Sequence, residues 1–257
     1  GFIATANHNI VPPGYRYDLA FDWSVPYRID RIREVLAEDR RFSVEDFEKL
    51  QQDEKSVAAR EVIAILRSIP APKNADAARS YSALLAWDGV LGKNSSGAAL
   101  YSLFFRTLRN HFVNQVVPAK LREILQTRLD NRVLVREFLK LPPPARTEMV
   151  EKSLSQAWAG AVEKMGQDPA SWRWGALHTA LFENPLANTA TRAAAFNVGP
   201  IARGGDAFTV NATGGSGLRQ TSGASYRHIL DFSNWDASVF TSTPGQSGQL
   251  GSPYYDN

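Results

Sequence analysis

The spacing of apolar residues divides this chain into a helical region and a region of short strands and loops. Between residues 24 and 166, apolar side chains recur three or four positions apart, which is the period of an amphipathic helix. After Gly166, Gly, Ser, Thr and Asn become frequent, and short β-type runs stand between turn signals. We therefore predict an α+β chain, mainly helical in 24–166 and β/loop-rich in 167–257, with no independent domain boundary.

Capping residues and breakers indicate where the helices begin and end. Ser24 is a candidate cap for a first helix that carries Pro26 in its first turn. Ser43, with Asp46 three residues later, predicts the capping box of a second helix that continues to Pro70. Further helical patterns cover residues 81–87, 97–117, 120–139 and 149–165, and a triple proline at 142–144 precedes the last of them.

Three segments have the composition of strands. Residues 207–211 and 226–232 are β-type runs in the C-terminal third, and residues 2–6 form another at the start. The first run leads directly into Asn7, so a strand here would deliver a side-chain amide to its end. A chain does not normally begin inside such a strand, and we therefore expect these residues to be a piece of a larger protein.

Composition describes a folded chain and excludes several functions. Of the 257 residues, 44% are hydrophobic and 21% are charged, which is typical of globular proteins. The 29 basic and 26 acidic residues are interspersed, so the net charge of +3 does not predict nucleic-acid binding. No apolar stretch approaches the roughly 20 residues that span a bilayer. The absence of cysteine excludes disulfides, thiolate metal sites and a cysteine nucleophile.

The chain offers little catalytic chemistry of its own. Ser225, His228 and Asp231 contain the residue types of a catalytic triad. However, there is no GxSxG turn, and three residues so close on one strand cannot easily take three different roles. The four histidines lie at no metal-ligand spacing. A serine hydrolase that uses only these residues is therefore disfavoured.

Five sequence blocks are more specific when they are taken in order. They read GFIATANHN, DLAFDWSVPYRIDRI, WRWGALHTALFENPL, GGDAFTVNA and SYRHILDFSNWDASVFTSTPGQSGQLGSPYYDN. This series resembles the later part of the β chain of the penicillin acylase (penicillin amidase) family, the N-terminal-nucleophile amidohydrolases. The resemblance covers nearly the whole chain. It implies that residues 1–257 are part of one domain with the αββα architecture of that family.

The resemblance also implies an activity and partners. Family members hydrolyse a linear amide in an N-acylated small molecule of the penicillin, cephalosporin or acyl-homoserine-lactone type, which includes antibiotic modification. Their nucleophile is the serine at the start of the β chain, and Gly1 has no hydroxyl that could replace it. The expected partners are therefore the remaining β-chain segment and the α chain of one autoprocessed precursor, without which this fragment is inactive. The family further implies a bacterial periplasmic or secreted location and no organic cofactor. The alternative is a catalytically inactive binding or scaffold module with an acylase-like fold.

Two residues match catalytic positions of the family. Asn7 matches the asparagine of the oxyanion hole, and its amide N–H groups can donate to negative charge that develops on a substrate oxygen. A simple turn-capping role for Asn7 remains the alternative. Arg28 matches an arginine that orients this asparagine or the substrate. An ion pair with Asp22 or Asp30 is the alternative for Arg28.

The remaining matched residues are expected to be structural. Asp18 matches an aspartate that helps bind a structural calcium ion, whose other ligands would lie outside this chain. His8 would point to the opposite face of the first strand from Asn7. His178 is expected to be buried and hydrogen-bonded. Gly245 and Gly248 are expected to supply turns with positive φ.

Overall fold

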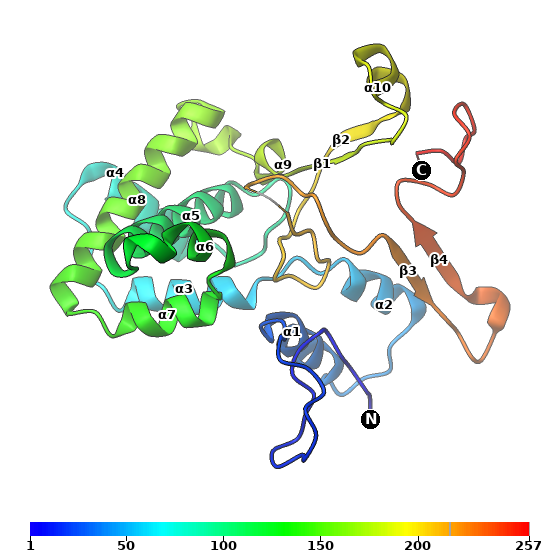
Figure 1. Ribbon diagram of the computed structural model, residues 1–257, viewed down its shortest axis with the longest axis horizontal. Helices are drawn as coiled ribbons and strands as arrows, with labels where there is room; N and C mark the ends of the chain where they lie inside the picture. The colour runs from blue at the N-terminus through cyan, green and yellow to red at the C-terminus, as the bar shows by residue number, and fades with distance from the viewer. Residues whose placement is uncertain (216, 257) are drawn as a thin grey trace.

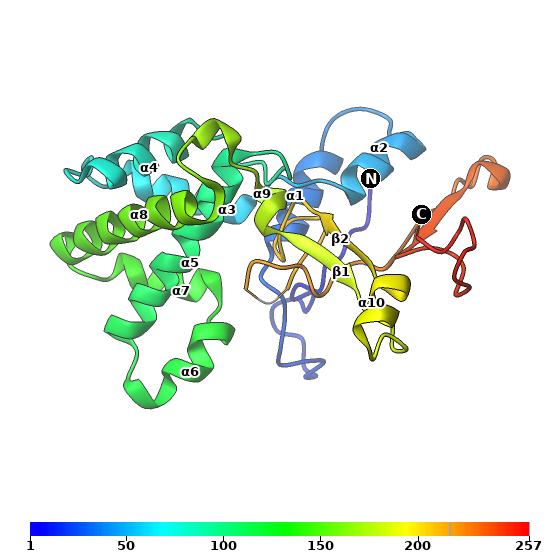
Figure 2. The same cartoon turned by 90° about the horizontal axis from the view of Figure 1, so that it is seen from above.

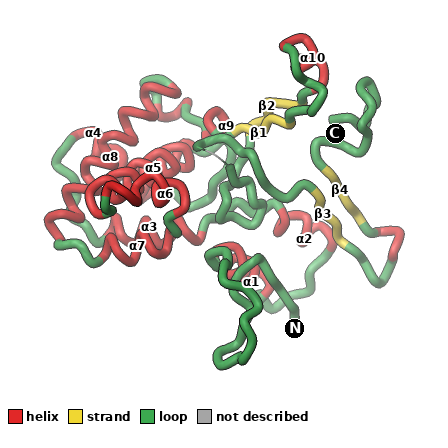
Figure 3. Tube along the Cα trace, in the orientation of Figure 1, coloured by secondary structure: helices red, strands yellow, loops and turns green. Residues whose placement is uncertain are grey.

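The computed structural model describes residues 1–215 and 217–256 and contains a helical body beside a looser part made of loops and two small sheets (Figures 1 and 3). The helices are α1 (Tyr27–Leu36), α2 (Val44–Gln51), α3 (Val57–Arg67), α4 (Ala75–Ala86), α5 (Ser96–Val116), α6 (Ala119–Arg128), α7 (Asn131–Leu139), α8 (Pro143–Met165), α9 (Trp174–Leu177) and α10 (Ala190–Phe196). The strands are β1 (Thr179–Phe182), β2 (Val198–Ala202), β3 (Tyr226–Ile229) and β4 (Val239–Ser242), and short 3₁₀ turns occupy Pro169–Ser171 and Trp235–Ala237. This mixture is α+β, as the sequence predicted.

The helical body is organised around α5 and α8. α5 packs along α8, and α8 packs along α4, as Figure 2 shows from above. Phe104 of α5 and Leu154 of α8 are completely buried between them, and Trp172 closes the same core from the segment that follows α8. Each large apolar side chain buried in this way contributes about 1.5–3 kcal/mol relative to an exposed one. Helices α3, α4, α5, α7 and α8 therefore bury their apolar faces in one core, whereas no described side chain of α6 is buried in it.

Side-chain caps decide the helix boundaries in this body. The predicted capping box is confirmed, because the Ser43 hydroxyl accepts from the Asp46 N–H at 3.3 Å and the Ser43 N–H donates to the Asp46 carboxylate at 2.9 Å. The predicted continuation to Pro70 is wrong. The helix ends at Gln51, and Ser56 starts α3 by accepting from the Ala59 N–H at 3.0 Å.

Three other helix boundaries differ from the prediction. Ser24 does not cap α1, which begins at Tyr27 with Pro26 at its N-cap and no side-chain cap, and the Ser24 N–H donates to the Asn7 carbonyl at 2.8 Å. Residues 120–139 form two helices, because Asp130 caps a new one. α8 begins at Pro143, six residues earlier than predicted, since a proline in the first turn of a helix loses no hydrogen bond.

Both sheets contain two antiparallel strands. β1 pairs with β2, and β3 pairs with β4 with Tyr226 opposite Ser242. The strand predicted within 226–232 is therefore confirmed for Tyr226–Ile229. The predicted strand at 207–211 is wrong, because the Asp206 carboxylate accepts the N–H groups of Phe208 and Thr209 and folds the segment into turns.

The strand predicted at residues 2–6 is also absent. This segment is loop, and the side chain of Ile3 is 99% exposed. A strand needs a neighbour that shares its backbone N–H and C=O groups, and among the described residues none lies beside this segment. The αββα arrangement implied by the resemblance stays a prediction, because the two small sheets described here do not test it.

Candidate functional site

Asn7 and Arg28, the two predicted catalytic-site residues, are in direct contact. The Arg28 Nη2 donates to the Asn7 Oδ1 at 2.9 Å and to the Ala6 carbonyl at 3.1 Å. Because the guanidinium occupies the amide oxygen, the Asn7 Nδ2 lies on the opposite side of the amide and has no partner among the described residues. The contact therefore presents an oriented N–H donor. Burial lowers the pKa of the Arg28 guanidinium.

The alternative interpretation of Arg28 as half of a surface ion pair is not supported. Asp30 pairs with Arg132 at 3.1 Å, and within the described part of the chain Arg28 forms no ion pair.

Hydrogen bonds fix the backbone around Asn7 in addition to its side chain. Asn7 has a φ of 59°, in the left-handed region that asparagine tolerates better than most residues. Its carbonyl accepts from the Ser24 N–H, which ties the N-terminal segment to the start of α1. His8 is buried, and its Nδ1 lies 3.4 Å from the Ala6 N–H. His8 thus supports the loop, and Asn7 is the exposed member of the pair.

Tyr27 anchors the helix that carries Arg28. Its side chain is 1% exposed, its hydroxyl donates to the Glu61 carboxylate at 2.8 Å, and its ring meets the Phe208 ring edge-on. Burial and the bond to Glu61 raise the pKa of Tyr27, so the hydroxyl stays protonated. Sequence reasoning missed this residue because it looks like an ordinary member of a helical pattern.

Asp18, the expected calcium ligand, lies in an exposed loop. In residues 1–215 and 217–256, no three His, Cys, Asp or Glu side chains lie together in a way that could hold a metal ion. The described residues therefore do not form a calcium site by themselves. The role of Asp18 stays a prediction.

The tryptophan-rich block is structural, as expected. The Trp174 indole N–H donates to the Gly205 carbonyl at 3.0 Å, and the His178 ring stacks on Trp174 with 4.6 Å between the ring centroids. The His178 Nδ1 lies 2.6 Å from the Leu218 carbonyl oxygen. Burial lowers the pKa of His178 and keeps its imidazole neutral. The prediction of a buried, hydrogen-bonded histidine is confirmed.

The block Gly204-Gly205-Asp206 is more closely surrounded by other residues than a simple turn would be. A Cβ on Gly204 would overlap the Glu54 carboxylate, so a larger residue would require the Glu54 side chain to move. Gly205 has a φ of 75°. Burial raises the pKa of Asp206 to about 6, although the N–H groups of Phe208 and Thr209 donate to its carboxylate.

The remaining sequence candidates do not form a site. Asp231 binds the Ser233 hydroxyl and N–H, and the His228 ring lies against Tyr226, so the structure does not assemble a Ser225-His228-Asp231 triad. The expectation of positive φ at Gly245 and Gly248 is also wrong. A Cβ on Gly245 would instead lie 2.4 Å from the Tyr254 carbonyl oxygen, so close backbone approach explains that glycine.

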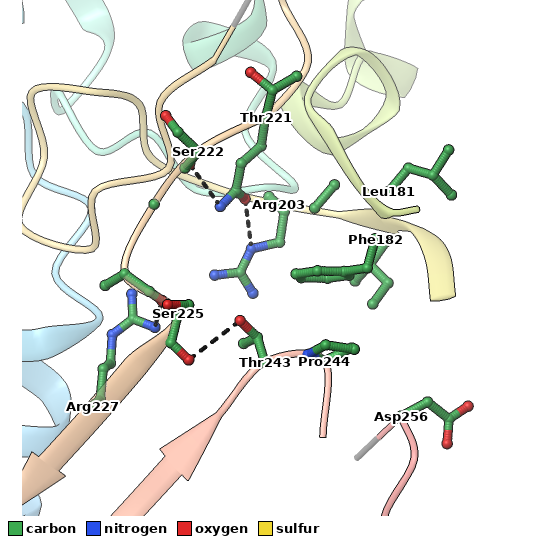
Figure 4. Close-up of a pocket in the computed structure, with 15 residues that line it drawn as sticks. Leu181, Phe182, Arg203, Thr221, Ser222, Ser225, Arg227, Thr243, Pro244 and Asp256 are labelled. Carbon is green, nitrogen blue, oxygen red and sulfur yellow. Dashed lines mark hydrogen bonds between the residues drawn. The ribbon is translucent and has the colours of Figure 1, made fainter. Parts of the chain in front are cut away.

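A cavity of about 390 Å³ lies between the β1–β2 sheet and the β3–β4 sheet (Figure 4). Phe182 and Pro244 form apolar walls, and Arg203 and Arg227 bring two positive charges to it. The Arg203 Nε donates to the Gln220 Oε1 at 3.2 Å. The sequence contained only an indirect signal for this cavity, namely the position of Arg203 directly before two glycines.

Comparison with known proteins places the chain in a family. The penicillin amidase family matches residues 1–257, the whole chain. The chain belongs to the penicillin amidase family. This confirms the resemblance seen in the order of the five sequence blocks.

Several curated members of the penicillin amidase family are similar to this chain. Acyl-homoserine lactone acylase QuiP is 26% identical in Pseudomonas fluorescens and 28% identical in Pseudomonas syringae pv. tomato, in each case over 100% of this chain. Penicillin acylase 2 proenzyme of a Pseudomonas species is 28% identical over 99% of this chain. The chain spans 35% of the length of the QuiP relatives and 34% of the proenzyme.

In the part of the chain that the structure describes, every helix is too short or too polar to cross a lipid bilayer.

Proposed function

We propose that this chain forms part of an amidohydrolase that cleaves the amide bond of an N-acylated small molecule, with Asn7 in the oxyanion hole. The observation that carries the proposal is the contact between Arg28 and the Asn7 Oδ1, which leaves the Nδ2 amino group free to donate. The family match and the names of the relatives, acyl-homoserine lactone acylase and penicillin acylase, support the reaction class.

In the proposed reaction, a serine outside this chain attacks the carbonyl carbon of the substrate amide. The π electrons of the C=O bond move to the oxygen, and the Asn7 Nδ2–H donates to the resulting oxyanion. The serine hydroxyl proton passes to the base and then to the leaving nitrogen, so collapse of the tetrahedral intermediate expels a neutral amine. Water then hydrolyses the acyl-enzyme and restores the serine hydroxyl. A donor that is oriented before the reaction loses no energy in reorganising at the transition state, and this is why such groups contribute strongly to catalysis.

The proposal includes further parts of a processed precursor. The nucleophile, the base and the second oxyanion donor come from the remaining β-chain segment and the α chain, which agrees with similarity to a proenzyme of greater length. A periplasmic or secreted location and a calcium ion bound in part by Asp18 belong to the same proposal. Both are inferred from the resemblance to the family.

The test is the turnover of the full-length protein after Asn7→Ala. Removal of an oxyanion donor lowers kcat by about 10²–10³-fold, with a smaller change in KM. Asn9→Ala is the matched control, because Asn9 is also exposed and its Oδ1 only accepts from the Val11 N–H. Amide hydrolysis is measured with an acyl-homoserine lactone and with a penicillin, and circular dichroism verifies folding.

Two results would contradict the proposal. Equal turnover of Asn7→Ala and Asn9→Ala would show that Asn7 does not serve in the oxyanion hole. A processed wild-type protein that hydrolyses neither class of amide would favour the inactive binding module.

A further inference from the structure

Arg203 is held in place while its charged end stays unpaired. Its Nε donates to the Gln220 Oε1 at 3.2 Å. Gln220 is itself fixed, because its backbone N–H donates to the Thr179 carbonyl at 3.0 Å and its Nε2 donates to the Ser222 carbonyl at 3.3 Å. The Arg203 Nη1 and Nη2 form no hydrogen bond or ion pair with the residues that the structure describes. Figure 4 shows them beside Phe182, on the side of the cavity where Thr243 and Ser225 lie.

A second arginine increases the positive charge of the cavity and is held by two backbone carbonyls. The Arg227 Nη1 donates to the Ala224 carbonyl at 3.0 Å, and its Nη2 donates to the Asn211 carbonyl at 2.8 Å. Burial and the charge of Arg203 lower the pKa of Arg227. Two positive charges at one cavity repel each other, and an anion between them would relieve that repulsion.

The acidic groups near the cavity do not provide this anion. Asp256 lines the rim, and Figure 4 shows its carboxylate turned away from Arg203. Glu54 lies against Gly204 and feels the charge of Arg203, but within the described residues it forms no ion pair with this arginine.

The shape of the cavity indicates which kind of anion fits. The two terminal nitrogens of one guanidinium form a planar fork that matches the two oxygens of a carboxylate. Phe182, Ile201 and Pro244 line the cavity with apolar surface, and Thr243 brings a hydroxyl. Its volume of about 390 Å³ is within the range of small-molecule sites. A carboxylate attached to a short apolar group would bind the guanidinium through its two oxygens and contact the apolar walls through the attached group.

We propose that Arg203 binds a carboxylate in the cavity between the two sheets, with the attached apolar group against Phe182, Ile201 and Pro244. The carboxylate comes either from a free small molecule or from an Asp or Glu side chain in a part of the protein beyond residues 1–257. The relatives, of whose length this chain spans 35%, offer ample further sequence for the second source.

The first experiment measures hexanoate binding to the full-length protein by isothermal titration calorimetry and thermal shift, with hexanamide as the uncharged analogue. If the source is a small molecule, hexanoate binds and raises Tm in a concentration-dependent way, and hexanamide does not. Arg203→Gln then weakens binding by about tenfold or more, the loss expected when a charged hydrogen-bonding fork is removed. Arg192→Gln is the matched control, because Arg192 is exposed and donates to Asn188. Asn7→Ala is expected to bind hexanoate like the wild type, so the result does not depend on amide hydrolysis.

The second arm tests a carboxylate from within the protein. In that case hexanoate has no effect, and Arg203→Gln lowers the Tm of the full-length protein more than Arg192→Gln does. Neutralising the partner acid then gives a similar loss that is not additive with Arg203→Gln. If Arg203→Gln does not fold, Arg203→Lys, which keeps the charge and loses the fork, is expected to give a smaller loss in the same measurement. The proposal is overturned if the Arg203 variants match Arg192→Gln in both hexanoate binding and stability.

Discussion

The helical body and the two ends of the chain bury their apolar residues very differently. Phe104 and Leu154 in the body are 0% exposed, whereas Ile3 near the start is 99% exposed and Phe240 in β4 is 65% exposed. A helix satisfies its own backbone and needs neighbours only along one face, but a strand must share its backbone N–H and C=O groups with at least one neighbouring strand. The body therefore completes its core within these residues, and the ends do not.

The candidate catalytic residue belongs to the less complete region. Asn7 lies in a loop and is exposed, and its position depends on Arg28 and on the hydrogen bond from Ser24. The packed body contributes rigidity through Tyr27, which joins α1 to Glu61 of α3. Stability and the proposed chemistry thus depend on different regions, and four variants of the full-length protein examine that difference.

The largest effect on stability is expected inside the body. Leu134 and Leu139 both lie on α7, but Leu134 is 1% exposed and Leu139 is 45% exposed. Leu134→Ala should lower the free energy of unfolding by about 2–5 kcal/mol, because it removes buried surface and leaves a cavity. Leu139→Ala, with the same change in helix propensity, should cost much less. Urea unfolding measures the free energy of unfolding of both variants. Equal losses would contradict the assignment of Leu134 to the core and of Leu139 to the surface.

Arg28→Met examines the link between the two regions. Without the guanidinium the Asn7 amide is free to rotate, so kcat should fall by about 10–10²-fold, less than for Asn7→Ala, while KM changes little. Arg33→Met is the control, because Arg33 is an exposed residue of the same helix. Arg28→Lys should restore part of kcat. A fall in Tm without any change in kcat would show that Arg28 is only structural.

Ser43→Ala tests how much the helix cap contributes to the stability of the protein. The Ser43 hydroxyl caps α2, and loss of such a cap costs about 0.5–2 kcal/mol. Ser82→Ala, an exposed position inside α4, should not destabilise the protein because alanine favours a helix interior. Thermal unfolding of both variants compares them. A Ser43→Ala protein as stable as Ser82→Ala would show that tertiary contacts, and not the cap, hold α2.

The last comparison is a pH dependence at Asp206. Its folded pKa of about 6 lies above the ordinary 3.8, so the folded state binds the proton more tightly. The contribution of this group to stability is therefore fully present below pH 3.8 and is lost as the pH rises to about 6. Asp206→Asn removes this titration, so the stability of the wild type relative to the variant should decline across that window. Parallel pH profiles of the free energy of unfolding would contradict the assignment.

Several features could be predicted from the sequence because their causes are local. The helical periodicity of residues 24–166 and the capping box at Ser43 depend on residues three or four positions apart. The burial of His178 followed from its place in a tryptophan-rich block of family type. The order of the five blocks was sufficient for the family, which the match over residues 1–257 confirmed.

Other features depend on contacts between segments that are distant in the sequence. Residues 207–211 have a strand composition, yet they pair with no described strand, and the Asn211 N–H donates to the distant Asp53 carbonyl at 3.1 Å. Ser24 resembles a helix cap, yet its backbone binds Asn7. Residue types alone could not show that Arg203 would face a cavity with its charged end unpaired, because its partner Gln220 comes from another loop.

The sequence by itself determined the helical body, one capping box and the family. Helical periodicity and caps depend on residues a few positions apart, and ordered motifs can be recognised directly from their residue types. Only the tertiary structure decided that Arg28 donates to the oxygen of the Asn7 side-chain amide, that Tyr27 anchors α1 and that two arginines line one cavity. These arrangements depend on the angle at which separate segments meet, and that angle is set by the packing of all the segments together.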